Sequence, residues 1–266
     1  MRPLGATSLQ VSALGLGTVK LGRDQGVKYP GRFTIPDDRS ATALLALARD
    51  LGINLLDTAP AYGTSEERLG RLLRGQRRDW LICSKVGEEF GAGGSRFDFT
   101  PEYTRRSVQR SLQRLRTDAL DIVLVHSDGD DLGIIRNMGT LQALEALKHE
   151  GLVRAYGMST KTIEGGLAAA AVCDVVMPTY NLVESRALPV LDACFRLQRG
   201  ILVKKPLASG HLPPGHGDPV QASMDLVFAH PGTSAAIVGT ICTAHLRSDV
   251  RAVRRALSRQ APAGSC

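Results

Sequence analysis

Four polar side chains could together move a proton to or from an oxygen atom. Asp57, Lys85 and His126 each follow a short apolar run, and Tyr62 lies in the segment after Asp57. A phenol titrates near pH 10, but a neighbouring ammonium group favours the phenolate and lowers its pKa. A carboxylate can keep that lysine charged, and an imidazole can hydrogen-bond the substrate oxygen or complete a proton path. These residue types predict acid-base chemistry at a substrate oxygen.

Each of the four residues also has an ordinary structural explanation. An aspartate after a strand is often a helix cap, a loop tyrosine often packs, and a lysine at a strand end is often solvated. A histidine after Leu124-Val125 is often a core residue. Their occurrence after three consecutive apolar runs favours a shared site, because the ends of parallel strands meet at one edge of a sheet.

Eight apolar runs rich in Val, Ile and Leu alternate with helix-like stretches along the chain. Continuous apolar runs of this length are typical of parallel strands that are buried on both faces. Between them, Val108, Leu112 and Leu115 recur at helical spacing, and Thr64-Ser65-Glu66-Glu67 matches a helix capping box. The predicted strands cover residues 13–17, 53–56, 80–84, 119–125, 153–158, 175–177, 200–204 and 235–238.

Eight such units in one domain-sized chain predict an α/β fold, a closed (β/α)8 TIM barrel that forms a single domain over residues 1–266. The alternative is an open doubly wound sheet, which normally carries G-x-G-x-x-G after its first strand. Here that segment is 15–20, Gly-Leu-Gly-Thr-Val-Lys, which lacks the third glycine. Residues 2–4 and 9–11 predict a short N-terminal β-hairpin ahead of the barrel.

Composition argues against several other kinds of protein. The chain has 33 Lys and Arg against 26 Asp and Glu, a net charge of +7, but its aromatic content is only 5% and does not interleave with the arginine clusters. This pattern favours solvated helix faces and no nucleic-acid partner. The sequence shows no signal peptide and no membrane-spanning run. Five scattered cysteines without a C-x-x-C pair predict reduced thiols, no metal site and a cytoplasmic location: Cys83, Cys173, Cys194, Cys242 and Cys266.

Several segments resemble the aldo-keto reductase family. The most specific is Asp57-Thr58-Ala59-Pro60-Ala61-Tyr62-Gly63, followed by Ser65-Glu66 and Leu69-Gly70. The match continues in order through residues 82–85, 121–126, 157–159, 180–182, 206–210 and 237–240. The resemblance implies a barrel in which Tyr62 is the general acid of carbonyl reduction and Asp57, Lys85 and His126 complete a catalytic tetrad.

The resemblance also implies a nicotinamide cofactor that lies extended across the barrel mouth. NADPH is the expected cofactor and NADH the alternative, with residues 211–217 folded over the pyrophosphate. His245 stands where the family often has an arginine for the 2′-phosphate. That charge could come instead from Arg247, Arg251, Lys204 or Lys205. The implied cofactor-binding residues are Gly17, Thr18, Asp57, Ser159, Lys204, Lys205, Leu207, Ser209, Gly239, Thr240, His245 and Asp249.

The sequence departs from the family pattern at a few of these positions. Thr160 replaces an asparagine that helps to hold the nicotinamide amide, and Met177 replaces a glutamine. Lys204 stands near the position of an aromatic residue that stacks on the nicotinamide. Val238 replaces a proline, and Asp249 replaces an asparagine near the adenine.

The expected substrate is a small aldehyde or ketone, with aldoses included because acidic residues at 128, 130 and 131 suit hydroxyl-rich compounds. A long loop over residues 87–99 is expected to shape the pocket through Phe90, Phe97 and Phe99. The protein is expected to be a monomer or homodimer. Two alternatives remain: a redox-sensing regulatory subunit, and a lyase or isomerase that uses Lys85 as a Schiff-base amine. Asp57 favours a charged lysine over a nucleophilic one.

Overall fold

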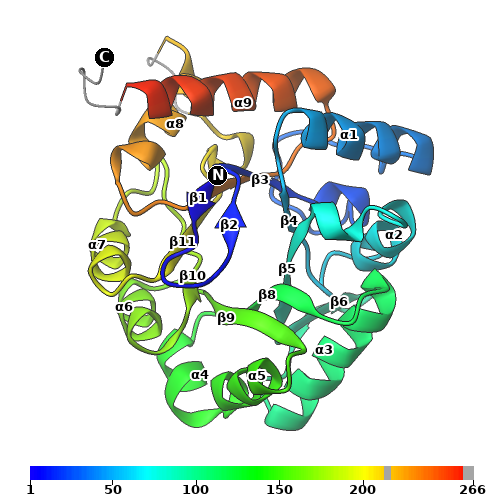
Figure 1. Cartoon of the computed structure of the whole chain (residues 1–266), viewed down its shortest axis with the longest axis vertical. Helices are drawn as coiled ribbons and strands as arrows, with labels where there is room; N and C mark the ends of the chain where they lie inside the picture. Colours follow the sequence, from blue (N-terminus) through cyan, green and yellow to red (C-terminus); the bar gives the residue numbers. More distant parts are fainter. Residues whose placement is uncertain (213–216, 260–266) are drawn as a thin grey trace.

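The fold is a closed barrel of eight parallel strands (Figure 1). The computed structural model describes residues 1–212 and 217–259. The predicted fold class is confirmed, and every predicted strand end lies within two residues of the observed one. The strands are β3 (Leu14–Gly17), β4 (Leu55–Asp57), β5 (Leu81–Val86), β8 (Leu120–His126), β9 (Val153–Ser159), β10 (Val175–Val176), β11 (Gly200–Lys204) and β12 (Ala235–Val238).

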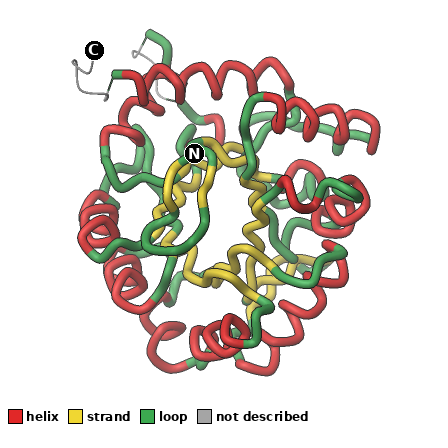
Figure 2. The backbone as a smooth tube through the Cα atoms, viewed as in Figure 1, coloured by secondary structure: helices red, strands yellow, loops and turns green. Residues whose placement is uncertain are grey.

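Helices surround the barrel and cover the outer face of its strands (Figure 2). Their apolar stripes face inward: in α3, Val108 and Leu115 are buried. Thr100 caps that helix by accepting a hydrogen bond from the backbone of Tyr103. The described helices are α1 (Asp38–Asp50), α2 (Ser65–Leu72), α3 (Pro101–Leu115), α4 (Asp131–Asn137), α5 (Thr140–His149), α6 (Ile163–Val172), α7 (Leu188–Arg196), α8 (Pro219–Ala229) and α9 (Thr243–Ser258), with short 3-10 turns η1 (Val19–Leu21), η2 (Arg77–Asp79) and η3 (Ala208–Gly210). Of these helices, none is long and apolar enough to cross a membrane.

The predicted N-terminal hairpin is present, and it closes one end of the barrel. Strands β1 (Arg2–Pro3) and β2 (Gln10–Val11) pair antiparallel, and they lie in front of the barrel in Figure 1. Leu4, Leu9 and Val11 are at most 2% exposed and belong to the core cluster inside the barrel. Because the hairpin leads directly into β3, it covers the N-terminal ends of the strands and leaves the C-terminal ends for a site.

Side-chain alternation places the polar residues at the open end. Leu55 and Cys83 belong to the cluster inside the barrel. Asp57 and Lys85 lie two residues after them on the same strands, so they point to the same face. Likewise, Leu124 lies inside the barrel, two residues before His126 on β8. The apolar layers therefore end in a polar layer at the C-terminal mouth.

The predicted capping box at the start of α2 is wrong. Thr64 precedes the helix with φ −87° and ψ 8°, and its side chain makes no capping hydrogen bond. A capping side chain normally needs extended backbone at that residue. Ser65 instead turns inward, with its hydroxyl 2.8 Å from that of Thr18, and Glu66 is buried and accepts a hydrogen bond from Ser84.

The segment predicted as a long loop contains a second hairpin. Strands β6 (Glu88–Gly91) and β7 (Gly94–Phe97) pair antiparallel, with Glu88 opposite Phe97. Gly87 leads into this hairpin with φ +99°, and a Cβ atom there would lie 2.4 Å from the ring of Phe99. The turn therefore requires glycine, for backbone conformation and for space.

Candidate active site

Lys85 and Asp57 form a buried ion pair at the barrel mouth. Lys85 Nζ donates to Asp57 Oδ1 over 2.5 Å and to the carbonyl of Thr58 over 2.9 Å. The two charged side chains are only 2% and 6% exposed. Burial has the largest single effect and acts to lower the pKa of Lys85, but the charge and hydrogen bond of Asp57, together with Tyr62 and Cys83, outweigh it and the pKa is raised. Lys85 is therefore an ammonium group, which disfavours the Schiff-base alternative.

Tyr62 lies beside this ion pair. Lys85 Nζ is 4.9 Å from the centroid of the Tyr62 ring. Lys85 lowers the pKa of Tyr62 as expected from the sequence, but burial acts more strongly and the net pKa is raised. The phenol therefore keeps its proton, in the form that an acid requires.

A tight turn holds Tyr62 in place. Gly63 has φ +60°, and a Cβ atom there would lie 2.1 Å from the carbonyl oxygen of Gly22. The backbone of Tyr62 donates to the carbonyl of Ala59 over 3.0 Å. The loop after β4 therefore packs directly against the chain that follows η1, and glycine permits this approach.

His126 completes the group of four residues predicted from the sequence. Its ring stands edge-on to that of Tyr62, with the centroids 6.3 Å apart at an angle of 86°. Burial lowers the pKa of His126, and Glu88 opposes this shift. The fold thus brings together Asp57, Tyr62, Lys85 and His126 from β4, β5, β8 and one loop.

Glu88 is a site residue that the sequence prediction missed. Its Oε2 lies 2.7 Å from Nδ1 of His126, which it approaches obliquely. Burial by itself would raise the pKa of Glu88, but the nearby His126, followed by Ser95 and Arg23, lowers it to about 2. The available signal was alternation: Glu88 faces the mouth, whereas the next residue, Glu89, contacts Tyr103 on α3.

Lys204 and Ser159, two predicted cofactor-binding residues, are in direct contact. Lys204 Nζ donates to Ser159 Oγ over 2.8 Å and to the carbonyl of Thr160 over 2.7 Å. Burial, followed by the charge of Lys205, lowers the pKa of Lys204 to about 7. Its neutral hydrogen-bond partners differ from the carboxylate partner of Lys85, which explains the opposite pKa shifts.

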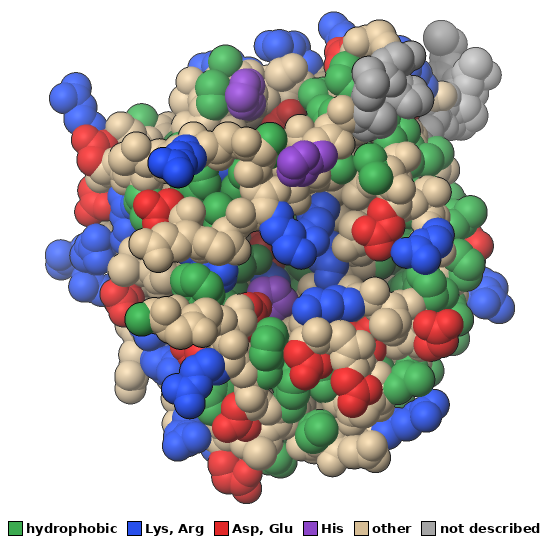
Figure 3. Space-filling model, turned by 180° about the vertical axis from the view of Figure 1, so that it is seen from behind, with side chains coloured by type: hydrophobic (Ala, Val, Ile, Leu, Met, Phe, Trp, Pro, Cys, Tyr) green, Lys and Arg blue, Asp and Glu red, His purple; other side chains and the backbone are tan. Residues whose placement is uncertain are grey.

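Several lysines give the barrel mouth a positive charge. Burial, and then the charge of Lys28, lowers the pKa of Lys205, and Lys161 acts in the same direction. Within the described ranges, neither Lys204 nor Lys205 forms an ion pair with a carboxylate. Figure 3, viewed from the side opposite to the N-terminal hairpin, shows Lys and Arg side chains around a hollow in which a histidine is visible. This unpaired charge suits an anionic dinucleotide.

The loop between η1 and α1 also crosses the mouth, which the sequence prediction missed. The Tyr29 hydroxyl lies so near Gly239 that a Cβ atom there would be 2.8 Å away. Pro30 likewise lies close to Gly210, where a Cβ atom would be 3.1 Å from the proline ring. Lys20 Nζ lies 3.8 Å from the centroid of the Tyr29 ring. A bound dinucleotide at Gly239 would therefore meet Tyr29.

The first strand contributes two of the predicted residues. Gly17 ends β3 and pairs in register with Asp57. The hydroxyl of Thr18 is buried and donates to the backbone carbonyl of Asp57 over 2.9 Å. Thr18 therefore supports the strand end that carries the carboxylate.

The remaining predicted cofactor residues lie farther along the chain. Leu207 packs against the core, and Ser209 has a left-handed φ of 57° within η3. Thr240 Oγ1 accepts a hydrogen bond from the backbone of Cys242 over 3.1 Å, just before α9. In the predicted loop 211–217, residues 213–216 lie outside the described residues.

Two predicted residues lie one turn apart on α9. His245 is exposed, whereas Asp249 is 4% exposed. Burial raises the pKa of Asp249 to about 7. Because residues four apart lie on the same side of a helix, His245 and Asp249 are neighbours along α9. No hydrogen bond links Asp249 to another side chain in the described part of the structure.

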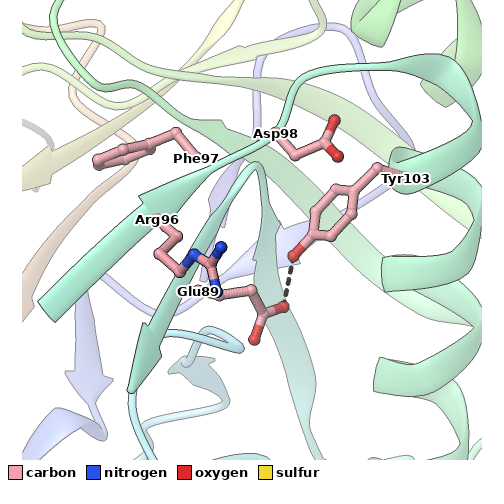
Figure 4. A pocket seen from close by; sticks show the side chains of 5 residues that line it. All are labelled: Glu89, Arg96, Phe97, Asp98 and Tyr103. Carbon is pink, nitrogen blue, oxygen red and sulfur yellow. Dashed lines mark hydrogen bonds between the residues drawn. The ribbon is translucent and has the colours of Figure 1, made fainter. Parts of the chain in front are cut away.

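The predicted substrate-loop phenylalanines have different surroundings. The Arg23 guanidinium lies 3.3 Å from the centroid of the Phe90 ring. Phe97 stacks on Phe99 with centroids 6.0 Å apart, and Phe99 is 7% exposed and packs into the core. Phe97 also lines a groove of about 330 Å³ on the outer side of the second hairpin, together with Glu89, Arg96, Asp98 and Tyr103 (Figure 4).

Two of the acidic residues after β8 have structural roles. Asp131 is buried and accepts hydrogen bonds from the backbone of Lys161 and from the backbone and hydroxyl of Thr162. Asp130 caps α4 by accepting a hydrogen bond from the backbone of Gly133. These contacts weaken the expectation that the acidic segment recognises sugar hydroxyls. In residues 1–212 and 217–259, no group of three or more His, Cys, Asp or Glu side chains could hold a metal ion.

Comparison with known proteins identifies the family. The aldo-keto reductase family matches residues 13–225, and the chain belongs to that family. A solved structure from Pseudomonas aeruginosa, assigned to the same family, is 58% identical, with a TM-score of 0.89 over 96% of this chain and 94% of the other.

Curated relatives are more distant and longer. The oxidoreductase YqkF from Bacillus subtilis is 30% identical over 218 residues, which are 79% of this chain and 66% of the relative. L-Galactose dehydrogenase from Arabidopsis thaliana is 32% identical over 226 residues, which are 80% of this chain and 66% of the relative. The chain thus spans about two thirds of the length of these relatives.

Proposed function

We propose that this protein is a nicotinamide-dependent carbonyl reductase in which Tyr62 donates a proton to the substrate oxygen. The observation that carries the proposal is the buried Lys85–Asp57 ion pair, at 2.5 Å, beside Tyr62 at the open end of the barrel. Membership of the aldo-keto reductase family supports it. The bound nicotinamide would supply the hydride.

The residues of the chain divide the proton chemistry among them. Tyr62 keeps its proton until the carbonyl oxygen gains negative charge, and then donates it. Lys85 stabilises the phenolate that results, because its ammonium charge is already in place and needs no reorganisation. Asp57 keeps Lys85 charged and oriented. In the direction of alcohol oxidation, the same groups accept the proton.

The lysines of the barrel mouth would hold the cofactor. Lys204, Lys205 and the half-buried backbone at Gly239 line the region next to the tetrad, and Ser159 would contact the nicotinamide amide. Excess positive charge supports NADPH over NADH, because NADPH carries an additional phosphate. NADH remains the alternative, since one relative, 33% identical over 168 residues, is an NADH-specific methylglyoxal reductase from Escherichia coli.

The proposed substrates are small aldehydes and ketones, with aldoses among them. The similarity to L-galactose dehydrogenase supports the inclusion of aldoses. We further propose that residues 1–266 form a single domain that acts in the cytoplasm as a monomer or homodimer. Its partner is a small-molecule substrate, with no nucleic acid or membrane involved. The free state of Cys83, Cys173, Cys194 and Cys242 supports the location.

Tyr62→Phe tests the proposal. We expect kcat to fall about 10²- to 10⁴-fold while cofactor binding is retained, because the variant lacks only the donated proton. The measurement is NADPH and NADH absorbance against a panel of aldehydes, ketones and aldoses, with cofactor affinity from fluorescence. Tyr103→Phe is the matched control. The Tyr103 hydroxyl donates a hydrogen bond to Glu89 on the side of the hairpin that faces α3, away from the barrel mouth.

Near-normal turnover by Tyr62→Phe would exclude the proposed proton donor. Equal turnover with NADH and NADPH at the same low concentration would contradict the cofactor preference. The Tyr103→Phe variant should match the unmodified protein with both cofactors.

A further inference from the structure

Lys204 ends β11 and points into the barrel mouth. Leu202 on the same strand belongs to the cluster inside the barrel, so Lys204, two residues later, faces the same interior. Its amine contacts Ser159, which pairs in register with His126 on the neighbouring strand. The amine therefore lies one side chain away from the proposed tetrad. Because Lys204 is only half-buried, a small molecule in the mouth can reach it.

The hydrogen-bond partners of this amine suit its neutral form. Nζ lies 2.8 Å from Ser159 Oγ and 2.7 Å from the carbonyl oxygen of Thr160. A neutral amine has two N–H groups to donate to these two acceptors, and its lone pair then remains free. Lys85 differs, because the carboxylate of Asp57 favours its third proton. In residues 1–212 and 217–259, no carboxylate forms an ion pair with Lys204.

Charged neighbours on several elements also disfavour the ammonium form of Lys204. Burial lowers its pKa most, followed by the charges of Lys205, Lys85 and Lys161. Asp131 on α4 acts in the opposite direction, but its hydrogen bonds are with the loop after β9. Partial burial and neighbouring cations are the conditions under which a lysine amine acts as a nucleophile.

We propose that Lys204 is a covalent binding site for small aldehydes when no cofactor is bound. The nitrogen lone pair adds to the carbonyl carbon, and the carbonyl oxygen becomes a hydroxyl group. Loss of water then forms a C=N bond, and the two hydrogens of the amine leave with the former carbonyl oxygen. The imine forms reversibly and needs no oxidant or reductant.

The charges beside Lys204 select among aldehydes. Lys205 is exposed next to it, and Lys161 Nζ donates to the backbone carbonyl of Asp128. Neither lysine forms an ion pair with a carboxylate in the described part of the chain. An aldehyde that carries a carboxylate group should therefore react about fivefold faster than an uncharged one.

This inference goes beyond the proposed reductase function. Lys204 and Ser159 are the residues proposed to contact the nicotinamide, so an imine at Lys204 would exclude the cofactor. Aldehyde and cofactor would thus compete for the free protein. Because formation of the imine requires no hydride transfer, the two proposals can fail separately.

Reductive trapping of the full-length protein without cofactor tests the site. Sodium cyanoborohydride converts an imine with butanal, or with succinic semialdehyde of the same chain length, into a stable secondary amine. Peptide mass spectrometry measures the label at each lysine, and fragmentation separates Lys204 from Lys205. At pH 7 we expect Lys204 to react about a hundredfold faster than Lys148, because about half of its amine is neutral and an ordinary lysine is almost fully charged.

Labelling of Lys204 no faster than that of Lys148 would overturn the proposal. Succinic semialdehyde should label Lys204 about fivefold faster than butanal does, with Lys148 as the internal reference for the reactivity of each aldehyde. Equal relative rates for the two aldehydes would refute the selection by charge.

Ser159→Asp and Ser159→Asn form a matched pair of variants. The two substituted side chains have nearly the same shape, but only aspartate gives Lys204 a carboxylate partner. Ser159→Asp should reduce the label at Lys204 at least about tenfold, and Ser159→Asn should keep it within about twofold. Equal labelling in both would contradict the role of a neutral amine. If neither variant folds, the labelling of the unmodified protein decides.

Cofactor affinity of the trapped protein is a separate readout. NADPH fluorescence should show at least about a tenfold rise in Kd after trapping, because the label occupies the proposed nicotinamide site. An unchanged Kd would refute exclusion of the cofactor by the adduct. If the untreated protein binds no NADPH or NADH, the proposed function fails, and the label at Lys204 still decides the covalent site.

Discussion

At the scale of single residues, two lysines at the barrel mouth show how a hydrogen-bond partner decides the chemistry of an amine. Lys85 faces the carboxylate of Asp57, and its pKa is raised. Lys204 has the hydroxyl of Ser159 and a backbone carbonyl as partners, and its pKa is lowered to about 7. Both lie near the C-terminal ends of barrel strands, so their difference depends on which neighbours the fold brings to each.

We predict that Lys204 makes the binding of oxidised cofactor depend on pH. Lys204 is charged below about pH 7 and neutral above it. The oxidised nicotinamide ring is positively charged and the reduced ring is not. Protonated Lys204 should therefore weaken the binding of NADP⁺ relative to that of NADPH. The ratio of the two Kd values should fall about tenfold, or about 1.4 kcal/mol, from pH 6 to pH 8.

Fluorescence titration at both pH values measures this ratio, in which the phosphate contributions cancel. Lys204→Met should abolish the pH dependence, and Lys148→Met should retain it, because Lys148 pairs with Asp174 on another part of the barrel. A pH dependence that survives in Lys204→Met would rule out this role.

At the scale of elements, apolar runs located every barrel strand but not the second hairpin. Buried parallel strands have continuous Val, Ile and Leu, which single them out from their surroundings. The segment 88–97 has two adjacent glutamates and several glycines, which are depleted in strands. Its strands form because the hairpin packs its aromatic residues, as with Phe97 on Phe99.

We predict that Gly87→Ala destabilises the protein and displaces the hairpin. The left-handed φ of +99° and the close approach to Phe99 both penalise a Cβ atom, by about 1 to 3 kcal/mol in total. Urea unfolding followed by fluorescence measures the loss. The Glu88–His126 contact should weaken with it.

Gly91→Ala is the control for this prediction. Gly91 lies in the same hairpin, and a Cβ atom there would have no neighbour within 4 Å. It should change the free energy of unfolding by less than about 0.5 kcal/mol. Equal effects of the two substitutions would show that the approach to Phe99 has no energetic consequence.

At the scale of the whole molecule, the packing of α9 onto the rest of the fold buries the carboxylate of Asp249, which forms no ion pair within the described residues. Asp249 on α9 is 4% exposed, and its pKa is raised from 3.8 to about 7. Between these values the folded protein holds a proton that the unfolded chain has released. Stability therefore falls as pH rises from about 4 to about 7, and the full deficit is present above pH 7.

We predict that Asp249→Asn removes this fall. The variant should match the unmodified protein at pH 4 and exceed its free energy of unfolding by roughly 1 to 4 kcal/mol at pH 8. Chemical denaturation across this pH range is the measurement. Asp50→Asn, at the exposed end of α1, should change little. Parallel pH curves for Asp249→Asn and the unmodified protein would show that the buried carboxyl has no such shift.

The sequence by itself determined the barrel and the position of the four residues proposed as a catalytic tetrad. Apolar periodicity locates each strand, and alternation then decides which side chain points inward at its end, as with Asp57 after Leu55 and Lys85 after Cys83. These relations are local, so they can be predicted without knowing how the strands pair.

Only the tertiary structure decided the electrostatics of the mouth. Lys204 meets Ser159 across 45 residues of sequence, and Glu88 meets His126 from a hairpin that the strand pattern does not reveal. The pKa of Tyr62 is raised because burial exceeds the effect of Lys85, and burial depends on the loops that close over the barrel. A pKa is set by neighbours in space, and barrel closure selects those neighbours.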